Sequence, residues 1–250
     1  MDSGFYAACA GLRAQTQALE VEAHNLANVN TAGFRGEKTT FQSTLALAHP
    51  RAPNAVNLAT NNYAVLEGTH LDLSTGSLKS TGNALDMAIE GSGFFAVETS
   101  QGVRYTRNGS FQVSSAGELV TAAGDRVQGV QLVQGKSRKI LVPAGEPTVS
   151  PDGTVSVNGA VAGQIRLVDF PAETALKTEG GSLLSAPAAS EQAAPGATLL
   201  PATLESSNVN PITEVVKLIG VQREAEMLGR AMSLFDSEFN HIAASELGKV

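Results

Sequence analysis

The chain has 250 residues, of which 42% are hydrophobic, so it is long enough to bury a core in one large domain or in two small ones. Its formal net charge of −7 provides no basic field that would attract a polyanion, which argues against nucleic-acid binding. Trp is absent and aromatic residues make up only 5% of the chain, which argues against an aromatic-lined pocket for a small molecule.

An amphipathic helix is predicted within residues 1–34. Phe5, Leu12, Leu19 and Leu26 recur every seven residues, the spacing that keeps one stripe against a partner helix in a coiled coil. An ordinary amphipathic helix lying on its own domain shows the same stripe, so this alternative stays open. No basic n-region precedes the helix, and no window approaches the roughly 18 apolar residues of a membrane span, so we expect neither a cleaved signal peptide nor a transmembrane segment.

The end of this helix is rich in amides. Asn25, Asn28 and Asn30 are followed by Gly33 and Phe34. An asparagine side chain can cap a helix end, adopt left-handed geometry or bond to the backbone of a neighbouring segment, and glycine takes conformations that a side chain disfavours. These residues are predicted to fix where the helix ends. Residues 35–84, which follow, have little periodicity and are expected to be irregular or extended.

Residues 85–170 show a different pattern, in which short β-branched or aromatic runs alternate with turn sequences. This pattern predicts a central antiparallel all-β domain. Two turn units, VSSAGEL and VSPDGTV, resemble each other and are candidates for corresponding hairpins. Residues 171–204 are rich in Ala and Pro and are expected to form a linker that returns the chain.

A second long helix is predicted within residues 205–250. Asn210 followed by Pro211 reads as an N-cap with proline at the first helical position, and Asn208 lies just before this pair. Gly220 and Gly229 each lower the stability of the helix by about 1 kcal/mol relative to alanine. Because they weaken the isolated helix, we expect that they allow another helix to approach closely. The apolar residues that follow at three- and four-residue steps are Val215, Leu218, Ala225, Leu228, Met232, Phe235, Phe239 and Ile242.

The predicted fold class is therefore α+β: long N- and C-terminal helices that pair as a coiled coil, irregular extended segments, and a central antiparallel all-β domain. Two paired helices of this kind each keep an uncovered face, because a pair does not make a closed core. The pattern points to assembly with further copies or with other proteins.

The sequence contains few motifs that are typical of catalysis or ligand binding. The relaxed dinucleotide motif formed by Gly91, Gly93 and Ala96 runs into a predicted strand, whereas dinucleotide binding needs these residues to open a helix. The single Cys9 and four scattered histidines have no metal-ligand spacing. We expect no catalytic residue, no cofactor, no metal and no small-molecule substrate.

Three long motifs carry a family resemblance. NLANVNTAGFRGEKTTFQS (residues 25–43) resembles the N-terminal signature of flagellar basal-body rod and hook proteins, and LESSNVNPITEVVKLIGVQREAEM (residues 204–227) resembles their C-terminal signature. LDMAIEGSGFFAVETSQGVRYTRNGSFQVSSAGELVT (residues 85–121) is similar to the central segment of the rod members. One departure is Ala32, where the family usually has proline, so the turn after the helix is expected to be softer.

The resemblance implies a structural subunit of the bacterial flagellar rod. Members are axial components that form homo-polymers, contact other rod proteins, and are exported unfolded through the flagellar type III export apparatus without a cleaved signal peptide. Their terminal helices form an inner tube, and the rod acts as a drive shaft that transmits motor torque across the periplasm. The asparagines of the two signatures are then expected either to anchor segments between subunits or only to cap their own helices.

Within the family, the length near 250 residues, the proline in SNVNP and the short preceding linker resemble the proximal-rod member more than the distal-rod member. The distal rod is the alternative. A different class of function also stays open, a β-domain binding module dimerised by its helical ends, with an enzyme third.

Overall fold

The computed structural model describes residues 2–43, 64–130, 138–171, 174–187, 190–194 and 196–247. The chain divides into two compact units. The helical unit comprises Met1–Ala27, Glu37–His70 and Asn210–Val250, and the β unit comprises Asn28–Gly36 and Leu71–Val209. The N-terminal signature is therefore split, because residues 28–36 belong to the β unit although both of their flanks belong to the helical unit.

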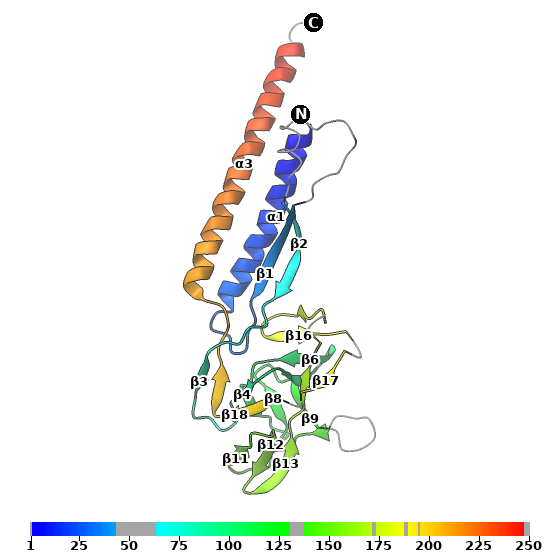
Figure 1. Ribbon diagram of the computed structural model, residues 1–250, viewed down its shortest axis with the longest axis vertical. Coiled ribbons are helices and arrows are strands. Elements are labelled where there is room, and N and C mark those ends of the chain that lie inside the picture. The colour runs from blue at the N-terminus through cyan, green and yellow to red at the C-terminus, as the bar shows by residue number, and fades with distance from the viewer. Residues whose placement is uncertain are drawn as a thin grey trace. The chain divides into compact units, whose positions relative to one another are not determined.

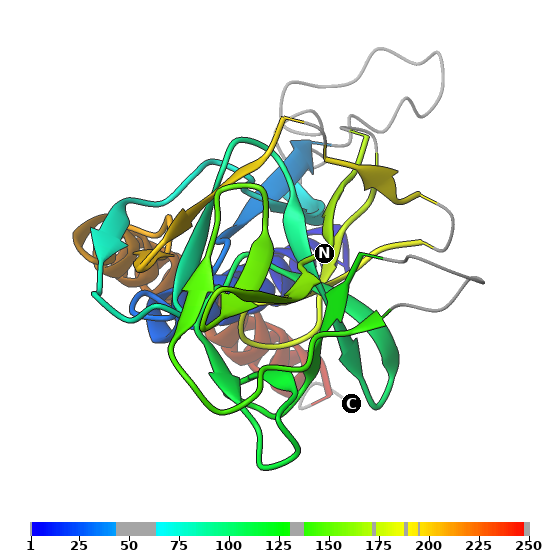
Figure 2. The same cartoon turned by 90° about the horizontal axis from the view of Figure 1, so that it is seen from below.

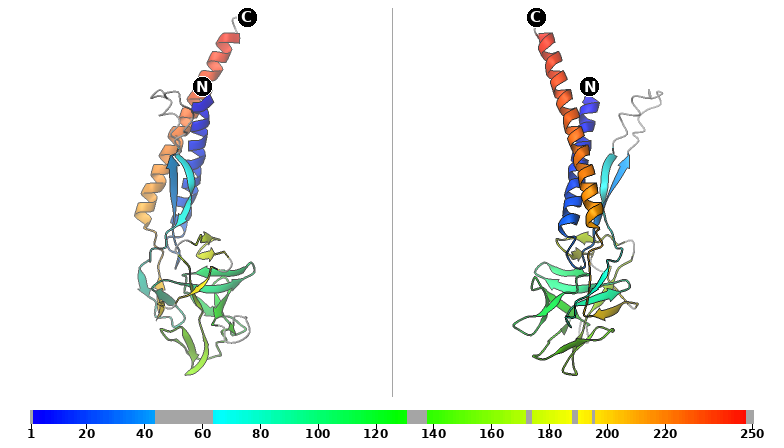
Figure 3. Two further views of the ribbon diagram at one scale, coloured as in Figure 1. Left: turned by 45° about the vertical axis from the view of Figure 1, so that its right-hand side comes forward. Right: turned by 90° about the vertical axis from the view of Figure 1, so that its left-hand side faces the viewer.

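The helical unit is built on two antiparallel helices that lie side by side, α1 (Asp2–Ala27) and α3 (Pro211–Leu247), with β1 (Glu37–Ser43) paired to β2 (Ala64–Leu71) beside α1 (Figures 1 and 3). Small residues bring the helices together: a Cβ on Gly11 would lie 3.3 Å from Cδ1 of Leu228. The C-terminal end of α3 extends past the start of α1 (Figure 3). Within the described residues, neither helix combines the length and apolarity needed to cross a membrane.

The β unit is a set of antiparallel sheets, which confirms the predicted antiparallel domain (Figure 2). Its main sheet has the strand order β15-β16-β6-β5-β9-β8-β7, with β10 on β9 and with β14 pairing both β5 and β17. Smaller sheets are β11-β12-β13, β18-β4 and β19-β3. The strands are β3 (Leu78–Ser80), β4 (Met87–Glu90), β5 (Phe94–Thr99), β6 (Gly102–Thr106), β7 (Phe111–Val113), β8 (Leu119–Thr121), β9 (Arg126–Gly129), β10 (Arg138–Lys139), β11 (Pro147–Val149), β12 (Thr154–Val157), β13 (Ala160–Gln164), β14 (Leu167–Asp169), β15 (Lys177–Thr178), β16 (Leu183–Ser185), β17 (Gln192–Ala193), β18 (Thr198–Pro201) and β19 (Thr203–Glu205).

Strand β5 lies at the centre of this unit and is buried on both faces. Phe95 and Val97 belong to the larger core cluster, whereas Phe94 and Ala96 belong to a second cluster. Because successive strand residues point to opposite faces, the continuous apolar run FFAV supplies both clusters. The ring of Phe95 packs edge-on against Phe111 with centroids 5.0 Å apart.

Strands also occur in the two segments that were expected to be irregular or linker-like. In residues 35–84 the structure has β1, β2 and β3, and in residues 171–204 it has β15 to β18 and most of β19. β18 pairs with β4, and β19 pairs with β3. Short strands with few β-branched residues form here because distant partners offer free edges, which local sequence patterns do not report.

The two similar turn units do form the same turn. In the first, Ser114 N–H donates to the Glu118 carbonyl at 2.9 Å and Gly117 N–H donates to the Ser114 carbonyl at 2.9 Å. The second repeats both bonds between Ser150 and Thr154 and between Gly153 and Ser150, each at 2.9 Å. The glycines have φ of +74° and +85°, which explains why glycine stands at the same place in both units.

Candidate functional site

The N-terminal signature enters the β unit at Gly33. This residue has φ of +66°, and a Cβ there would lie 2.2 Å from both the Arg107 carbonyl carbon and the Asn108 nitrogen. Its N–H donates to the Glu205 carbonyl at 2.8 Å, and the following Phe34 is fully buried. Glycine is required at this point because the backbone is left-handed and because the Arg107–Asn108 peptide lies so close that a side chain has no room.

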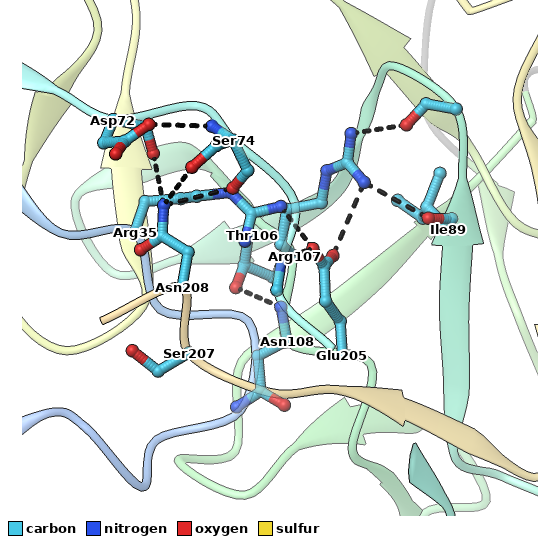
Figure 4. Close-up of polar contacts among 12 residues, drawn as sticks. Arg35, Asp72, Ser74, Ile89, Thr106, Arg107, Asn108, Glu205, Ser207 and Asn208 are labelled. Carbon is cyan, nitrogen blue, oxygen red and sulfur yellow. Dashed lines mark hydrogen bonds and ion pairs between the residues drawn. The ribbon is translucent and has the colours of Figure 1, made fainter. Parts of the chain in front are cut away.

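A buried charge cluster follows directly (Figure 4). Arg35 Nη2 donates to Glu205 Oε1 at 2.6 Å, and Arg107 Nη1 lies 3.5 Å from Glu205 Oε2. The three residues are 3%, 5% and 1% exposed in the order Arg35, Arg107 and Glu205. Glu205 Oε1 also accepts from the N–H of Gly76 at 2.8 Å. One carboxylate therefore joins both signature segments to the core of the β unit.

The guanidinium of Arg107 is held on its other side by backbone carbonyls. It donates to Ile89 at 3.2 Å and to Gly91 at 2.7 Å, and its carbon lies 5.3 Å from the ring centroid of Phe94. Burial lowers the pKa of Arg107 and the Glu205 carboxylate opposes this effect. A buried ion cluster of this kind gives specificity of folding more than net stability, because desolvation offsets much of the attraction.

Asn208 uses its whole amide to join three segments of the β unit (Figure 4). Its Oδ1 accepts from the N–H of Gly36 at 2.8 Å, and its Nδ2 donates to the carbonyls of Asp72 and Ser74 at 2.8 and 3.1 Å. The side-chain amide donates and accepts hydrogen bonds as a backbone amide does, and so links the C-terminal signature to the N-terminal one. These partners belong to its own chain, and none of them is a helix end.

Asn25 plays the corresponding part in the helical unit. Its Oδ1 accepts from the N–H of Glu37 at 2.9 Å, and its Nδ2 donates to the Glu37 carbonyl and to Glu214 Oε1, both at 2.8 Å. At 2% exposure it is one of the most buried polar residues of the chain. Asn25 thereby connects α1, β1 and α3.

The remaining signature residues lie at the helix ends. Asn28 accepts from the N–H of Thr31 at 3.0 Å in the turn after α1, and Asn30 is exposed in the same turn. Asn210 Oδ1 accepts from the N–H groups of Ile212 and Thr213 at 3.0 and 3.3 Å, and so caps α3, whose first residue is Pro211. The cap leaves the first turn of α3 without unpaired donors at these two positions.

The apolar positions chosen from the sequence lie at varied depths. Leu12, Leu19 and Leu26 on α1 are half-buried, and the buried apolar residues among the described side chains of this helix are Ala8, Ala14 and Ala18 on a neighbouring face. On α3, Val215 is 40% exposed, and the half-buried residues are Leu218, Ala225, Leu228 and Met232. The side chains of Phe5, Phe235, Phe239 and Ile242 lie outside those that the structure describes.

Sequence reasoning singled out Asn25 but did not predict the other polar residues that join the helices. The α1 stripe that meets α3 contains Gly11, Gln15, Glu22 and Asn25, and Gln15 Nε2 donates to Glu224 Oε2 at 2.7 Å. It also missed the cluster of Arg35, Arg107 and Glu205. A charged residue inside the otherwise small and apolar stretch GFRG was a usable signal for Arg35, whereas nothing local marked its partners.

Residues 91–96 have the geometry expected of a strand entry. Gly91 and Gly93 precede β5, which starts at Phe94, so no helix N-terminus faces this motif. In the described part of the chain, no three His, Cys, Asp or Glu side chains come together in a way that could hold a metal ion.

Three family models match the chain. They are described as flagella basal body rod protein (residues 5–35), flagellar hook protein FlgE/F/G D1 domain (residues 88–157) and flagellar basal body rod FlgEFG protein C-terminal (residues 201–237). The three matches follow one another in chain order and include Gly33, Arg35, Arg107 and Glu205, the residues that hold the signatures together.

Full-length relatives agree with these models. The flagellar basal-body rod protein FlgF of Caulobacter vibrioides is 31% identical over 252 residues and covers 100% of both chains. FlgF of Mesorhizobium japonicum is 32% identical over 90% of each chain, and FlgG of Bacillus subtilis is 33% identical over 87% of this chain and 89% of its own. Proteins with two different names are thus matched at nearly equal identity. With signature segments at both ends and an antiparallel β unit between them, this chain belongs to the family of flagellar basal-body rod proteins, which are structural proteins of the basal body.

Proposed function

We propose that this chain polymerises through its terminal helices as a subunit of the flagellar rod. The observation that carries the proposal is an apolar stripe on α3 that α1 leaves uncovered. Its members are Ile212, Val216, Ile219, Met227 and Leu234.

The stripe follows one face of the helix, on which Arg223 and Arg230 also lie, between Ile219, Met227 and Leu234. The five positions are separated by one or two helical turns, so they share one face. Ile212, Val216 and Leu234 are 78%, 66% and 70% exposed. Exposed apolar side chains that recur along one helix face often mark a protein contact, because their contact with water is unfavourable.

The exposed side of α1 has a different character. Arg13, Thr16, Gln17 and Glu20 are exposed and polar. The two helices therefore offer unlike outer faces, and α3 provides the apolar one. We infer that α3 is buried against neighbouring copies in the assembled rod, where α1 and α3 pair as a coiled coil.

The role that follows is mechanical rather than catalytic. A rod subunit joined to copies of itself and to other rod proteins forms part of a drive shaft that carries motor torque across the periplasm. Delivery of the chain by the flagellar export apparatus, unfolded and without a cleaved signal peptide, fits this role. Gln15, Glu22 and Asn25 then serve to hold the two helices in one register.

Within the rod we assign the chain to the proximal part. The support is its length near 250 residues, the Pro211 that follows Asn210, and the short linker that precedes the C-terminal signature. The distal rod is the competing assignment.

The test is electron microscopy of basal bodies from cells that lack this gene. A rod that stops early supports the proximal assignment, and a rod that stops just short of the hook supports the distal one. Intact basal bodies that bear hooks, on motile cells, contradict a role in the rod altogether.

A further inference from the structure

Two carboxyl groups are buried together between α1 and α3. Glu22 on α1 is 5% exposed and Glu214 on α3 is 4% exposed. Lys217 supplies the nearby cation: its Nζ lies 3.1 Å from Glu214 Oε2 and 3.7 Å from Glu22 Oε2. Two acids thus share one lysine in a seam that excludes most water.

The two carboxyl groups are not equivalent. Glu214 has a donor for each oxygen, Asn25 Nδ2 at 2.8 Å and Lys217 Nζ at 3.1 Å. Glu22 Oε2 is buried and has no hydrogen-bond partner among the described residues. Glu214 is therefore equipped to stay ionised, whereas Glu22 is not.

Because of this asymmetry, the pKa values of the two carboxyl groups shift in opposite directions. Burial, and then the hydrogen bond and negative charge of Glu214, together raise the pKa of Glu22 to about 7, against the opposing effect of Lys217. Burial also acts to raise the pKa of Glu214, but hydrogen bonds from Glu22, Asn25 and Lys217 outweigh it and leave that pKa below its usual value. The two carboxyl groups interact, so they titrate as a pair.

Other titratable groups near the pair are few. His24 is the next ionisable residue on α1, and β1, which packs on α1, contributes Glu37 and Lys38. Of these, Glu37 reaches the cluster through its backbone, which bonds to Asn25. His24 is the histidine nearest to Glu22 in the sequence, so a variant at this position serves as a control.

We propose that Glu22 and Glu214 form a proton-dependent lock on the pairing of α1 with α3. With one proton present, the acid of Glu22 donates to the carboxylate of Glu214 and the seam carries one negative charge opposite Lys217. Release of that proton to solvent leaves two buried carboxylates facing one lysine, and the repulsion weakens the pairing. The lock lies within a single chain, so it does not depend on the proposed assembly.

The direction of the pH effect is fixed by the sign of the shift. Because the pKa of Glu22 is raised in the folded chain from 4.5 to about 7, the paired state binds more protons between these values and loses stability as the pH rises through about 7. Glu214 acts at the acid end, where its lowered pKa means that stability is lost as the pH falls below its ordinary 4.5. Pairing is therefore strongest in mildly acidic solution.

The experiment compares urea unfolding of the full chain at pH 5.5 and pH 8.0, followed by the helical circular dichroism signal at 222 nm. For the unmodified chain we expect the pairing equilibrium to fall by on the order of tenfold to a hundredfold at the higher pH. Glu22→Gln, which imitates the protonated acid, removes this dependence and pairs more strongly than the unmodified chain at pH 8.0. Glu20→Gln, at an exposed position of the same helix, and His24→Gln keep the dependence.

Three results overturn the lock: equal unfolding of the unmodified chain at both pH values, loss of the dependence in His24→Gln, or its persistence in Glu22→Gln. If Glu22→Gln does not fold, carboxyl carbon NMR of the unmodified chain decides the matter. A Glu22 side chain that titrates near pH 7 supports the lock, and one that titrates near 4.5 refutes it.

Discussion

A single glycine determines how the N-terminal signature enters the β unit. Gly33 combines a left-handed backbone with a contact of backbone against backbone, since a Cβ would lie 2.2 Å from two atoms of the Arg107–Asn108 peptide. Neither constraint can be relieved by moving a flexible side chain. Any larger residue has to displace the peptide that also carries Arg107, and thereby disturbs the charge cluster around Glu205.

We expect Gly33→Ala to destabilise the β unit by at least ~3 kcal/mol, the sum of left-handed strain and overpacking. Gly82→Ala is the matched control, because Gly82 has φ of +76° but nothing lies within 4 Å of its added Cβ. That variant should lose only about 1 to 2 kcal/mol. Urea unfolding of both variants measures the difference. Equal losses of unfolding free energy would show that the close approach at Gly33 does not contribute to the effect.

At this scale the sequence predicted positions better than partners. Gly33, Asn208 and Asn210 were recognised as special because glycine and asparagine have local preferences that the pattern displays. Their contacts were not predictable: Asn208 was expected to cap a helix or reach another subunit, and it binds Gly36 and Asp72 of its own β unit. The bond between Arg35 and Glu205 joins residues 170 positions apart, a distance over which periodicity gives no information.

The two helices show how far an apolar pattern can be used. It located both helices, and Pro211 marked the start of α3. It did not identify the stripe that joins them, because Ala14 and Ala18 are buried in the seam while the larger Leu12, Leu19 and Leu26 are half-buried. Small residues pack helices closely but give a weak hydrophobic signal, and Gly11 against Leu228 is the clearest case.

Val216→Glu tests the uncovered stripe of α3. Val216 is 66% exposed, so we expect the free chain to keep its fold within about 0.5 kcal/mol. Rod assembly should fail, because a carboxylate buried against a neighbouring subunit has no partner. Far-UV circular dichroism of the purified chain measures the first outcome, and motility with basal-body microscopy of complemented cells measures the second.

Gln222→Glu is the control for charge, since it adds the same carboxylate to the same helix at an exposed polar position. Its cells should be motile. Motility in Val216→Glu cells would mean that this face of α3 stays in water in the rod.

At the scale of the whole molecule, segments from both signatures contribute to the β unit. Residues 28–36 and 203–209 are far apart in the sequence, yet together they supply Arg35, Glu205 and Asn208. The sequence placed the antiparallel strands of residues 85–170 in one domain because their alternation and turns are local. It did not assign these flanking segments to that domain, because only their long-range pairing puts them there.

Two shortened chains separate these contributions. A chain that ends at Val209 lacks α3 but keeps β19, Glu205 and Asn208, and its β unit should unfold at the same urea concentration as in the full chain. A chain that ends at Ala202 leaves Arg35 and Arg107 buried without their carboxylate, which should remove ~3–5 kcal/mol or prevent folding. Equal stability of the two chains would contradict the role assigned to the C-terminal signature.

The position of Glu205 in the sequence also determines when the newly made chain can complete its buried charge cluster. The ribosome produces Arg35 early and its partner 170 residues later, so the core strands emerge while the cluster that closes the unit is still missing its acid. Contacts between such distant residues form slowly as well, because a long loop must close before they bring any gain. The charge cluster of the β unit therefore cannot be completed before Glu205 has been made, late in synthesis.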